Sequence, residues 1–368
     1  MAVAEKITYT STPEQVESMH AAFDRALEEV RAELGQTYPL IIDGEERSGA
    51  STFEVRSPGD HDIVIGRFAA GGEADVNDAV AAAKAAFPDW SRRPWQDRVA
   101  IMRRAAELIR ERKFRLAAIL ILEAGKNRIE AIGEVEEGAD IVDEYASQME
   151  ENEGFTRRLD SLDPHERNRS VLRPFGVWAV LAPFNFPNAL SIGMSSGALL
   201  TGNTVVYKPA SATPLSGYEM ARIYADAGVP AGVFNYVSGS GEAVGDPLTH
   251  HPDVDGVVFT GSREVGWDLY KEFSKDFPKP CITELGGKFT VVDRSVTPGR
   301  TVSIHDTFEE AGSARDRAVT HESGNCRQWP DWASQAVRNH RRVRAYPAGR
   351  AIPASGCLKA GRSCSAGA

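Results

Sequence analysis

Strand-like and helix-like segments alternate without interruption between residues 176 and 283. Apolar runs typical of buried strands occupy 176–181, 204–207, 233–237, 254–259 and 281–283, and helical patterns fill 187–200, 214–227, 241–249 and 262–273. Repeated β–α units predict a mostly parallel sheet that is covered by helices on both faces. Ligands of such sheets bind at the carboxyl ends of the strands, so we expect a site in the loops that follow them.

Upstream of this region the patterns are different. An amphipathic helix is expected over 12–34, and short apolar stretches separated by turn residues predict hairpin strands within 38–68. Residues 73–151 are rich in Ala, Glu, Leu and Arg at helical spacing. They predict several long helices, interrupted by Pro88 and Pro94.

The C-terminal segment 298–368 differs in composition from the rest of the chain. Val, Ile, Leu, Phe and Met fill only 8 of its 71 positions, a share below the roughly 20 % at which a chain struggles to bury a core. No strand or helix pattern is expected there. One explanation is a natural disordered tail with a basic patch at 338–344. We favour a frameshifted or spurious C-terminus, because Ala, Gly and Arg have GC-rich codons and the break is abrupt.

Length, charge and cysteine usage limit the class of protein. A chain of 368 residues exceeds the ~250–300 residues of one core, which predicts at least two domains. Its net charge of −10 argues against a nucleic-acid partner. No apolar run reaches the ~18 residues of a membrane span, and the four cysteines form no C-x-x-C pair. We therefore expect a soluble, cytoplasmic protein without a membrane partner, a disulfide framework or a metal site, and we assign His250 and His251 to a loop.

The segment Pro183-Phe-Asn-Phe-Pro187 follows the first strand of the repeated region. An amide such as that of Asn185, at the carboxyl end of a strand, can donate a hydrogen bond to a developing oxyanion. The alternative is that Asn185 only shapes the turn.

Two further loops carry candidate ligand contacts. Lys208 ends the next strand and Ser211 follows it, where an ammonium and a hydroxyl could hold ribose hydroxyls or a 2′-phosphate. A solvated lysine at a strand end is the alternative. Gly241 and Gly245 open a helix after a strand, but their spacing departs from the G-x-G-x-x-G fingerprint, so by themselves they are a weak signal.

The last two motifs follow the final strands of the repeat. In Phe259-Thr-Gly261-Ser262, Ser262 can cap a helix whose N-terminal amides could meet a pyrophosphate, although many strand–helix turns use Gly-Ser for capping alone. Glu284 ends the next strand before a Gly-Gly turn, where a carboxylate could act as a general base or simply lie on the surface. Cys281 precedes it by three residues, so strand alternation places the two on opposite faces and makes Cys281 a core residue instead of a nucleophile.

Four motifs together resemble the aldehyde dehydrogenase superfamily in order and spacing: Pro183-Phe-Asn-Phe-Pro187, Lys208-Pro-Ala-Ser211, Phe259-Thr-Gly-Ser262 and Glu284-Leu-Gly-Gly-Lys288. The resemblance runs from about Tyr38 to about Ser295. Within that family the sequence, especially Lys208-Pro-Ala-Ser211 with Thr213-Pro-Leu-Ser-Gly217, is most similar to the 1-pyrroline-5-carboxylate (glutamate γ-semialdehyde) dehydrogenases. It implies an α/β fold with a Rossmann-type parallel sheet and a truncated catalytic domain.

The resemblance also implies the chemistry and the site residues. The family oxidises an aldehyde with NAD(P)+ through a cysteine thiolate. By this resemblance Asn185 lines the oxyanion hole, Glu284 activates the hydrolytic water, and the cofactor is held by Pro183, Phe184, Lys208, Ser211, Gly241, Gly245, Phe259, Gly261, Ser262 and Leu285. Ser211 stands where many relatives carry a Glu that disfavours a 2′-phosphate. NAD is the cofactor that the resemblance implies, and NADP is possible because Ser211 replaces that Glu.

The nucleophile that the family requires is missing from its expected place. Relatives carry it a few dozen residues past Glu284 in a Gly-Gln-x-Cys context, whereas 315–326 has no such motif and Cys326 is only the nearest thiol. Gly287-Lys-Phe-Thr290 also departs from the usual Gly-Lys-Asn-Pro. We expect the semialdehyde oxidation of proline degradation to be impaired. An inactive dinucleotide-binding pseudoenzyme or truncated fragment is the alternative, and a basic interaction tail is a minor third.

The sequence predicts four regions: an N-terminal helical extension (1–36), an NAD(P)-binding domain with the hairpin strands (37–284), the start of a catalytic domain (285–297) and an unrelated, disordered or frameshifted tail (298–368). A small-molecule aldehyde is the expected substrate. The family forms homo-oligomers, but the closing oligomerisation strand has no counterpart here, which argues against an oligomer.

Overall fold

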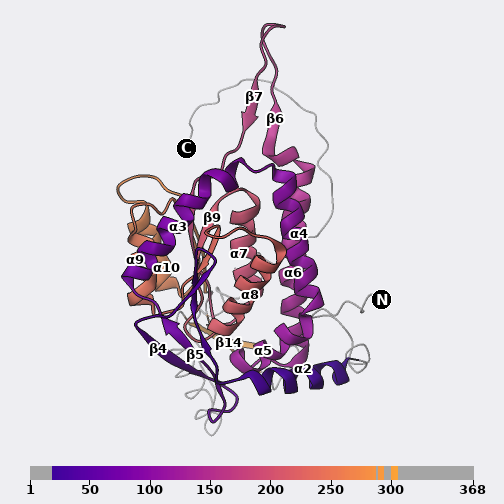
Figure 1. Ribbon diagram of the computed structural model, residues 1–368, viewed down its shortest axis with the longest axis vertical. Coiled ribbons are helices and arrows are strands. Elements are labelled where there is room, and N and C mark those ends of the chain that lie inside the picture. Colours follow the sequence, from indigo (N-terminus) through magenta and orange to yellow (C-terminus); the bar gives the residue numbers. More distant parts are fainter. Residues whose placement is uncertain (1–18, 287–288, 294–299, 306–368) are drawn as a thin grey trace, which may run out of the picture. The chain divides into compact units, whose positions relative to one another are not determined.

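The computed structural model describes residues 19–286, 289–293 and 300–305. The chain divides after Gly286 into two compact units. The four motifs that carry the resemblance begin in the first unit, which contains the large sheet and the helices α2 to α10 (Figure 1).

A seven-stranded sheet forms the centre of the first unit. Its strand order is β12-β11-β8-β9-β10-β2-β3. The first five strands are mutually parallel, whereas β2 and β3 join antiparallel at the other edge. The bounds are β2 Leu40–Ile42, β3 Glu45–Arg47, β8 Val177–Leu181, β9 Thr204–Lys208, β10 Phe234–Tyr236, β11 Gly256–Gly261 and β12 Cys281–Leu285. The mostly parallel sheet expected from the sequence is confirmed.

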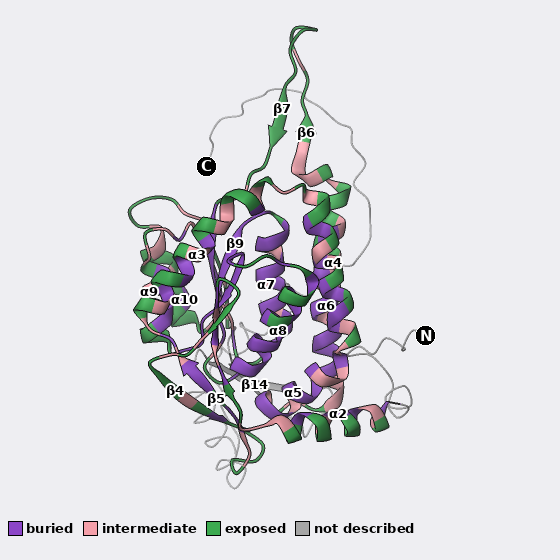
Figure 2. Ribbon diagram, in the orientation of Figure 1, coloured by how far each residue is buried: buried purple, intermediate pink, exposed green. Residues whose placement is uncertain are grey.

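Helices cover both faces of this sheet (Figure 1). Alternate residues of β9 belong to two different cores: Val205 and Tyr207 pack with the helices α4 to α8, and Val206 packs with α3 and α9. Figure 2 shows buried residues concentrated on the strands and on the sides of the helices that face them. The helices of the repeated region are α7 Ala189–Leu200, α8 Pro214–Ala227, α9 Asp246–His250 and α10 Arg263–Phe273, with a π-helical turn Gly241–Gly245 before α9.

Long helices occupy the segment 73–151, as its composition predicted: α3 Glu73–Arg92, α4 Trp95–Glu111, α5 Lys113–Ala124 and α6 Arg128–Glu151. Pro94 marks the start of α4. The expected interruption at Pro88 is wrong, because Pro88 lies inside α3. Proline removes one intrahelical hydrogen bond, but the last turn of α3 is held by Trp90, which is buried and donates from Nε1 to the carbonyl of Leu199 (3.1 Å).

The smaller elements are the N-terminal helix α2, two further small sheets and a 3-10 turn. α2 spans His20–Glu33, and the remainder of the helix expected over 12–34 lies outside the described residues. The hairpin strands expected within 38–68 are confirmed, because β2 pairs antiparallel with β3, and β4 Ser51–Arg56 pairs antiparallel with β5 Val64–Ala70. In addition, β1 Thr37–Tyr38 runs parallel to β5 and completes a three-stranded sheet with β5 and β4. A 3-10 turn, Glu153–Phe155, precedes the antiparallel pair β6 Thr156–Arg158 and β7 Arg169–Val171.

In the second unit, β13 Phe289–Asp293 pairs antiparallel with β14 Arg300–His305. No strand was expected beyond residue 298, so this expectation is wrong for 300–305, where β-branched Thr301, Val302 and Ile304 favour an extended chain. The rest of the predicted tail lies outside the described residues. Within the described parts of the chain, none of the helices is long and apolar enough to span a membrane.

Candidate active-site edge at the strand ends

The five parallel strands deliver their following loops to one edge of the sheet. In the register, Leu181 lies opposite Lys208 and Phe259, and Gly261 lies opposite Leu285, so the carboxyl ends of these neighbouring strands are level. The loops that carry Asn185, Lys208, Ser262 and Glu284 therefore all leave the sheet at the same side. This arrangement follows directly from parallel pairing.

The loop after β8 is fixed to the neighbouring strand at its base. The Ala182 N–H donates to the carbonyl of Lys208 (3.1 Å). Pro183 is buried, while Phe184 and Asn185 are exposed. The Asn185 amide therefore lies at the accessible side of the edge, where it can meet a ligand.

Lys208 is buried at the end of β9, so the solvated lysine that the sequence left open as an alternative is wrong. The residue is 7 % exposed, and its Nζ donates to the carbonyl of Pro209 (3.0 Å). Burial lowers the pKa of the Lys208 ammonium to about 8. No carboxylate pairs with it within the described residues. A buried ammonium of this kind is available to hydroxyl or phosphate oxygens of a ligand.

The loops after β9 and β10 are connected by hydrogen bonding and packing. Ser211 Oγ donates to the carbonyl of Gly239 (2.9 Å). The stem of Lys208 passes over Gly245, where a Cβ would lie 3.7 Å from Lys208 Cδ, and Gly241 faces open space. Lys208, Ser211 and the two glycines singled out from the sequence are thus brought together.

Ser262 caps α10, as expected from the sequence. Its hydroxyl accepts a hydrogen bond from the N–H of Val265 (3.4 Å), and the residue is extended as a cap requires. Ser262 is exposed, and behind it Gly266 is buried under Phe259 and Leu285. The helix start is therefore anchored from below and accessible from outside, which suits an anionic ligand.

Glu284 lies beside β11 at the same edge. Thr260, its register partner, donates from Oγ1 to Glu284 Oε2 (3.4 Å), and the Gly286 N–H donates to the carbonyl of Gly261 (3.1 Å). Glu284 is exposed. Its carboxylate is thus placed at the edge by strand pairing and is accessible to solvent.

Cys281 faces away from Glu284, as strand alternation predicted. Cys281 and Leu285 pack on the core of the α3 face, whereas Glu284 is on the exposed side of β12. Cys281 is half-buried, and burial raises the pKa of its thiol, which disfavours the nucleophilic thiolate. The other three cysteines lie outside the described residues.

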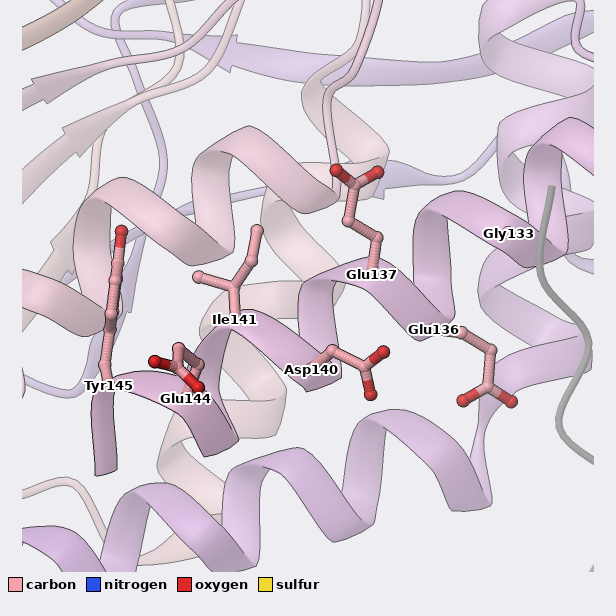
Figure 3. A pocket seen from close by; sticks show the side chains of 7 residues that line it. All are labelled: Gly133, Glu136, Glu137, Asp140, Ile141, Glu144 and Tyr145. Atoms are coloured by element: carbon pink, nitrogen blue, oxygen red, sulfur yellow. The ribbon is translucent and has the colours of Figure 1, made fainter. Parts of the chain in front are cut away.

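The two histidines and the cavity on α6 are not part of the candidate active-site edge. The described residues contain no group of side chains able to hold a metal ion. His250 is the last residue of α9 instead of a loop residue, with Nδ1 2.8 Å from the carbonyl of Asp246. A cavity of about 450 Å³ is lined by seven residues of α6 (Figure 3): Gly133, Glu136, Glu137, Asp140, Ile141, Glu144 and Tyr145.

The cavity on α6 contains none of the residues that the sequence singled out. Figure 3 shows Glu136 and Asp140 pointing away from Ile141 and Tyr145. Glu136 pairs with Lys113 (2.9 Å) and Asp140 pairs with Arg110 (3.0 Å). These two carboxylates therefore serve the contacts of α6 with α4 and α5.

Three charged residues that hold the site loops were not predicted from the sequence. Glu123, Lys126 and Glu134 are on or between α5 and α6, and the two glutamates accept hydrogen bonds at the N-termini of α8 and α7. The available signal was weak: neither Asn188 nor Thr213, at the starts of these helices, is followed three residues later by Glu or Gln. A carboxylate supplied from a distant helix has no local sequence pattern.

Comparisons with known proteins agree with this architecture. Residues 45–295 match the aldehyde dehydrogenase family. The 1-pyrroline-5-carboxylate dehydrogenase of Anoxybacillus flavithermus is 41 % identical over 286 residues, which cover 75 % of this chain and 54 % of that protein. The 1-pyrroline-5-carboxylate dehydrogenase 2 of Bacillus subtilis is 38 % identical over 312 residues, covering 82 % and 60 %. The chain thus spans little more than half the length of these curated relatives.

Solved structures show the same fold. The Thermus 1-pyrroline-5-carboxylate dehydrogenase with bound NAD superposes with a TM-score of 0.71 at 36 % identity, covering 78 % of this chain and 57 % of that one. Proline utilization A from Bdellovibrio bacteriovorus gives a TM-score of 0.71 at 31 % identity, covering 74 % and 29 %. Sequence, sheet order and the grouping of the motifs agree, and the chain belongs to the aldehyde dehydrogenase family.

Proposed function

We propose that the sheet edge binds NAD(P)+ for the oxidation of an aldehyde to a carboxylate, with glutamate γ-semialdehyde as substrate. The observation that carries this is the convergence of Asn185, Lys208, Ser262 and Glu284 at the ends of neighbouring parallel strands. The names of the relatives, 1-pyrroline-5-carboxylate dehydrogenases, support the substrate. We propose further that this activity is impaired in the present chain, because the sequence past Glu284 lacks the Gly-Gln-x-Cys nucleophile of the family.

The residues of the edge fit a dinucleotide. Lys208 is a buried cation without a carboxylate partner among the described residues, and Ser211 lies in the adjoining loop. Together they would hold the adenosine ribose. The exposed start of α10 at Ser262 would hold the pyrophosphate. The uncharged Ser211 does not repel a 2′-phosphate, so we propose that NADP+ is accepted beside NAD+.

The protein would supply positioning and electrostatic stabilisation. When bound, the nicotinamide would accept a hydride from the aldehyde carbon after a nucleophile, in the family a cysteine thiolate, has added to that carbon. Asn185 would donate from its amide to the oxygen that carries negative charge during the reaction. Glu284 would accept a proton from the water that attacks the resulting thioester, which breaks the C–S bond and releases the carboxylic acid and the cysteine thiol.

Calorimetry with the full chain tests the binding part of this proposal. We expect NAD+ and NADP+ to bind, and Lys208→Met to weaken both. The absence of binding at millimolar cofactor would contradict it. The activity part is tested by NAD(P)+-dependent oxidation of glutamate γ-semialdehyde.

A second candidate is a dinucleotide-binding protein without turnover. One observation favours it: Cys281, the cysteine within the described residues, faces the core opposite to Glu284. Binding of NAD+ without turnover is the expected result in that case. Robust turnover that is lost in Cys326→Ala would instead identify Cys326 as the nucleophile.

A further inference from the structure

Helices α7 and α8 begin directly after the loops that carry Asn185 and Lys208 to Ser211. Neither helix provides its own cap: Asn188 and Thr213, at their starts, make no capping hydrogen bond through the side chain. The first N–H groups of a helix need acceptors from elsewhere. In both helices the acceptor is a buried glutamate that belongs to a different helix.

Glu123 of α5 serves the start of α8. It is 3 % exposed and accepts from the N–H groups of Leu215 (2.6 Å) and Ser216 (2.9 Å), and from the Ser216 hydroxyl (2.6 Å). Burial raises the pKa of Glu123 to about 7, against the effect of these donors. The loop between Lys208 and α8 is thus held at its far end by Glu123.

Glu134 of α6 serves the start of α7. It is fully buried, and Oε1 accepts from the N–H groups of Asn188 (2.8 Å) and Ala189 (3.2 Å). Its Oε2 pairs with Lys126 Nζ (2.6 Å). Burial raises the pKa of Glu134, and the pairing with Lys126 opposes this rise.

Lys126 also contacts the loop that carries Asn185. Its Nζ lies 3.6 Å from the ring centroid of Phe186, the residue after Asn185, in a cation–π contact. The loop is therefore held at Phe186 by Lys126 and at Asn188 by Glu134. These contacts flank Asn185 on its C-terminal side, and the Ala182–Lys208 hydrogen bond holds the other side.

One turn after α5 connects the contacts of Glu123 with those of Lys126. Gly125, which follows the last residue of α5, has φ +70, and a Cβ there would lie 3.2 Å from Pro58 Cγ. This left-handed turn, which glycine adopts without strain, separates Glu123 from Lys126 by only three positions. The carboxylate for one loop and the ammonium for the other are thus supplied by one short segment.

Burying these charges is costly unless each is fully paired. A local Ser or Asp at each helix start would satisfy the same N–H groups at lower cost. We propose that Glu123 and the Lys126–Glu134 pair are positioning residues: Glu123 sets the loop of Lys208 and Ser211, and the pair sets the loop of Asn185. The nature of the ligand in this inference rests on the proposed function.

A crossed comparison of variants of the full chain tests the inference, with hydrogen–deuterium exchange and NAD+ calorimetry as readouts. Glu123→Gln is expected to increase exchange in 209–216 and to weaken NAD+ binding about tenfold, the effect of one charge-assisted hydrogen bond. Glu134→Gln and Lys126→Met are expected to increase exchange in 183–190 and to leave 209–216 unchanged.

Glu219→Gln is the matched control. Glu219 is a buried carboxylate of α8 that pairs with Arg115 (2.8 Å) and does not contact either loop. Its variant should lower the melting temperature without selective exchange in either loop. Should Glu123→Gln fail to fold, Ser216→Ala removes only the hydroxyl contact to Glu123 and should produce the same pattern more weakly.

Equal exchange in both loops for Glu123→Gln and Glu134→Gln would overturn the inference, since it would indicate general loss of stability. Unchanged exchange and unchanged NAD+ affinity in Glu123→Gln would overturn it as well. A full chain that binds no NAD+ contradicts the proposed function alone, because the exchange pattern still tests whether the two loops are positioned separately.

Discussion

Lys208 is a buried cation at the end of β9, and its Nζ donates a hydrogen bond to the carbonyl of Pro209 (3.0 Å). Its place at the end of a strand is visible in the apolar run Thr204-Val-Val-Tyr207. Its burial is not visible, because it depends on Gly245 and the loop after β10, which lie far along the chain. The roles of Glu123 and Glu134 are even harder to predict from the sequence, since the N–H groups that they accept from are more than 50 residues away in the chain.

The buried ammonium of Lys208 should make stability depend on pH. Its folded-state pKa of about 8 lies below the ordinary value of 10.5, so between these values the unfolded chain binds more protons and stability rises with pH. Below pH 8 the buried ammonium lowers the free energy of unfolding by its full amount, at most about 3 kcal/mol. Lys208→Met should therefore be more stable than the unsubstituted chain at pH 7, and this advantage should shrink towards pH 10.5.

Urea unfolding at both pH values measures this difference. The exposed Lys271→Met provides the control and should keep the pH dependence of the unsubstituted chain. An advantage of Lys208→Met that does not change between pH 7 and pH 10.5 would show that the ammonium is not the cause.

At the element scale, the β–α alternation predicted the strands and helices of the sheet, because strand and helix periodicities are local properties. It did not predict that 241–249 begins with a π-helical turn or that α3 continues through Pro88. Both depend on packing against other elements. The N-terminus of α10 was predicted correctly, since Ser262 is a local capping signal.

Substitution of Ser262 can separate its capping role from a ligand role. Ser262→Ala removes the cap and should lower the unfolding free energy by about 1 kcal/mol. Ser262→Asp keeps an acceptor for the Val265 N–H and should retain stability, but it places negative charge where we propose that the pyrophosphate binds. NAD+ affinity should therefore fall more in Ser262→Asp than in Ser262→Ala, as measured by calorimetry beside thermal unfolding.

The reverse order, with Ser262→Ala the weaker binder, would contradict a pyrophosphate site at this helix start. Such an outcome would leave Ser262 with its capping role only.

At the scale of the whole molecule, large apolar side chains are exposed near β12. Trp267 and Tyr270 stack on the outer side of α10 with ring centroids 5.9 Å apart, and both are more than half exposed. Phe277 and Ile282 are exposed as well. Exposed apolar side chains that lie together, as Trp267 and Tyr270 do, promote association.

Trp267→Ser combined with Tyr270→Ser should therefore reduce self-association and hydrophobic dye binding. Sedimentation velocity over a concentration series measures the first and fluorescence the second. Asp268→Ser, on the same helix, is the control and should behave like the unsubstituted chain. Equal association of the double variant and the unsubstituted chain would show that this surface is not responsible.

The sequence by itself determined the family, the order of the elements and the motifs that follow the strands, because these are properties of short segments. Only the tertiary structure decided which of these residues are buried, which meet at one edge, and which distant carboxylates hold the loops. The physical reason is that burial, helix capping from another element and pKa shifts depend on neighbours that are remote in the chain. Cys281 illustrates both: alternation placed it opposite Glu284, but only packing made its thiol a poor nucleophile.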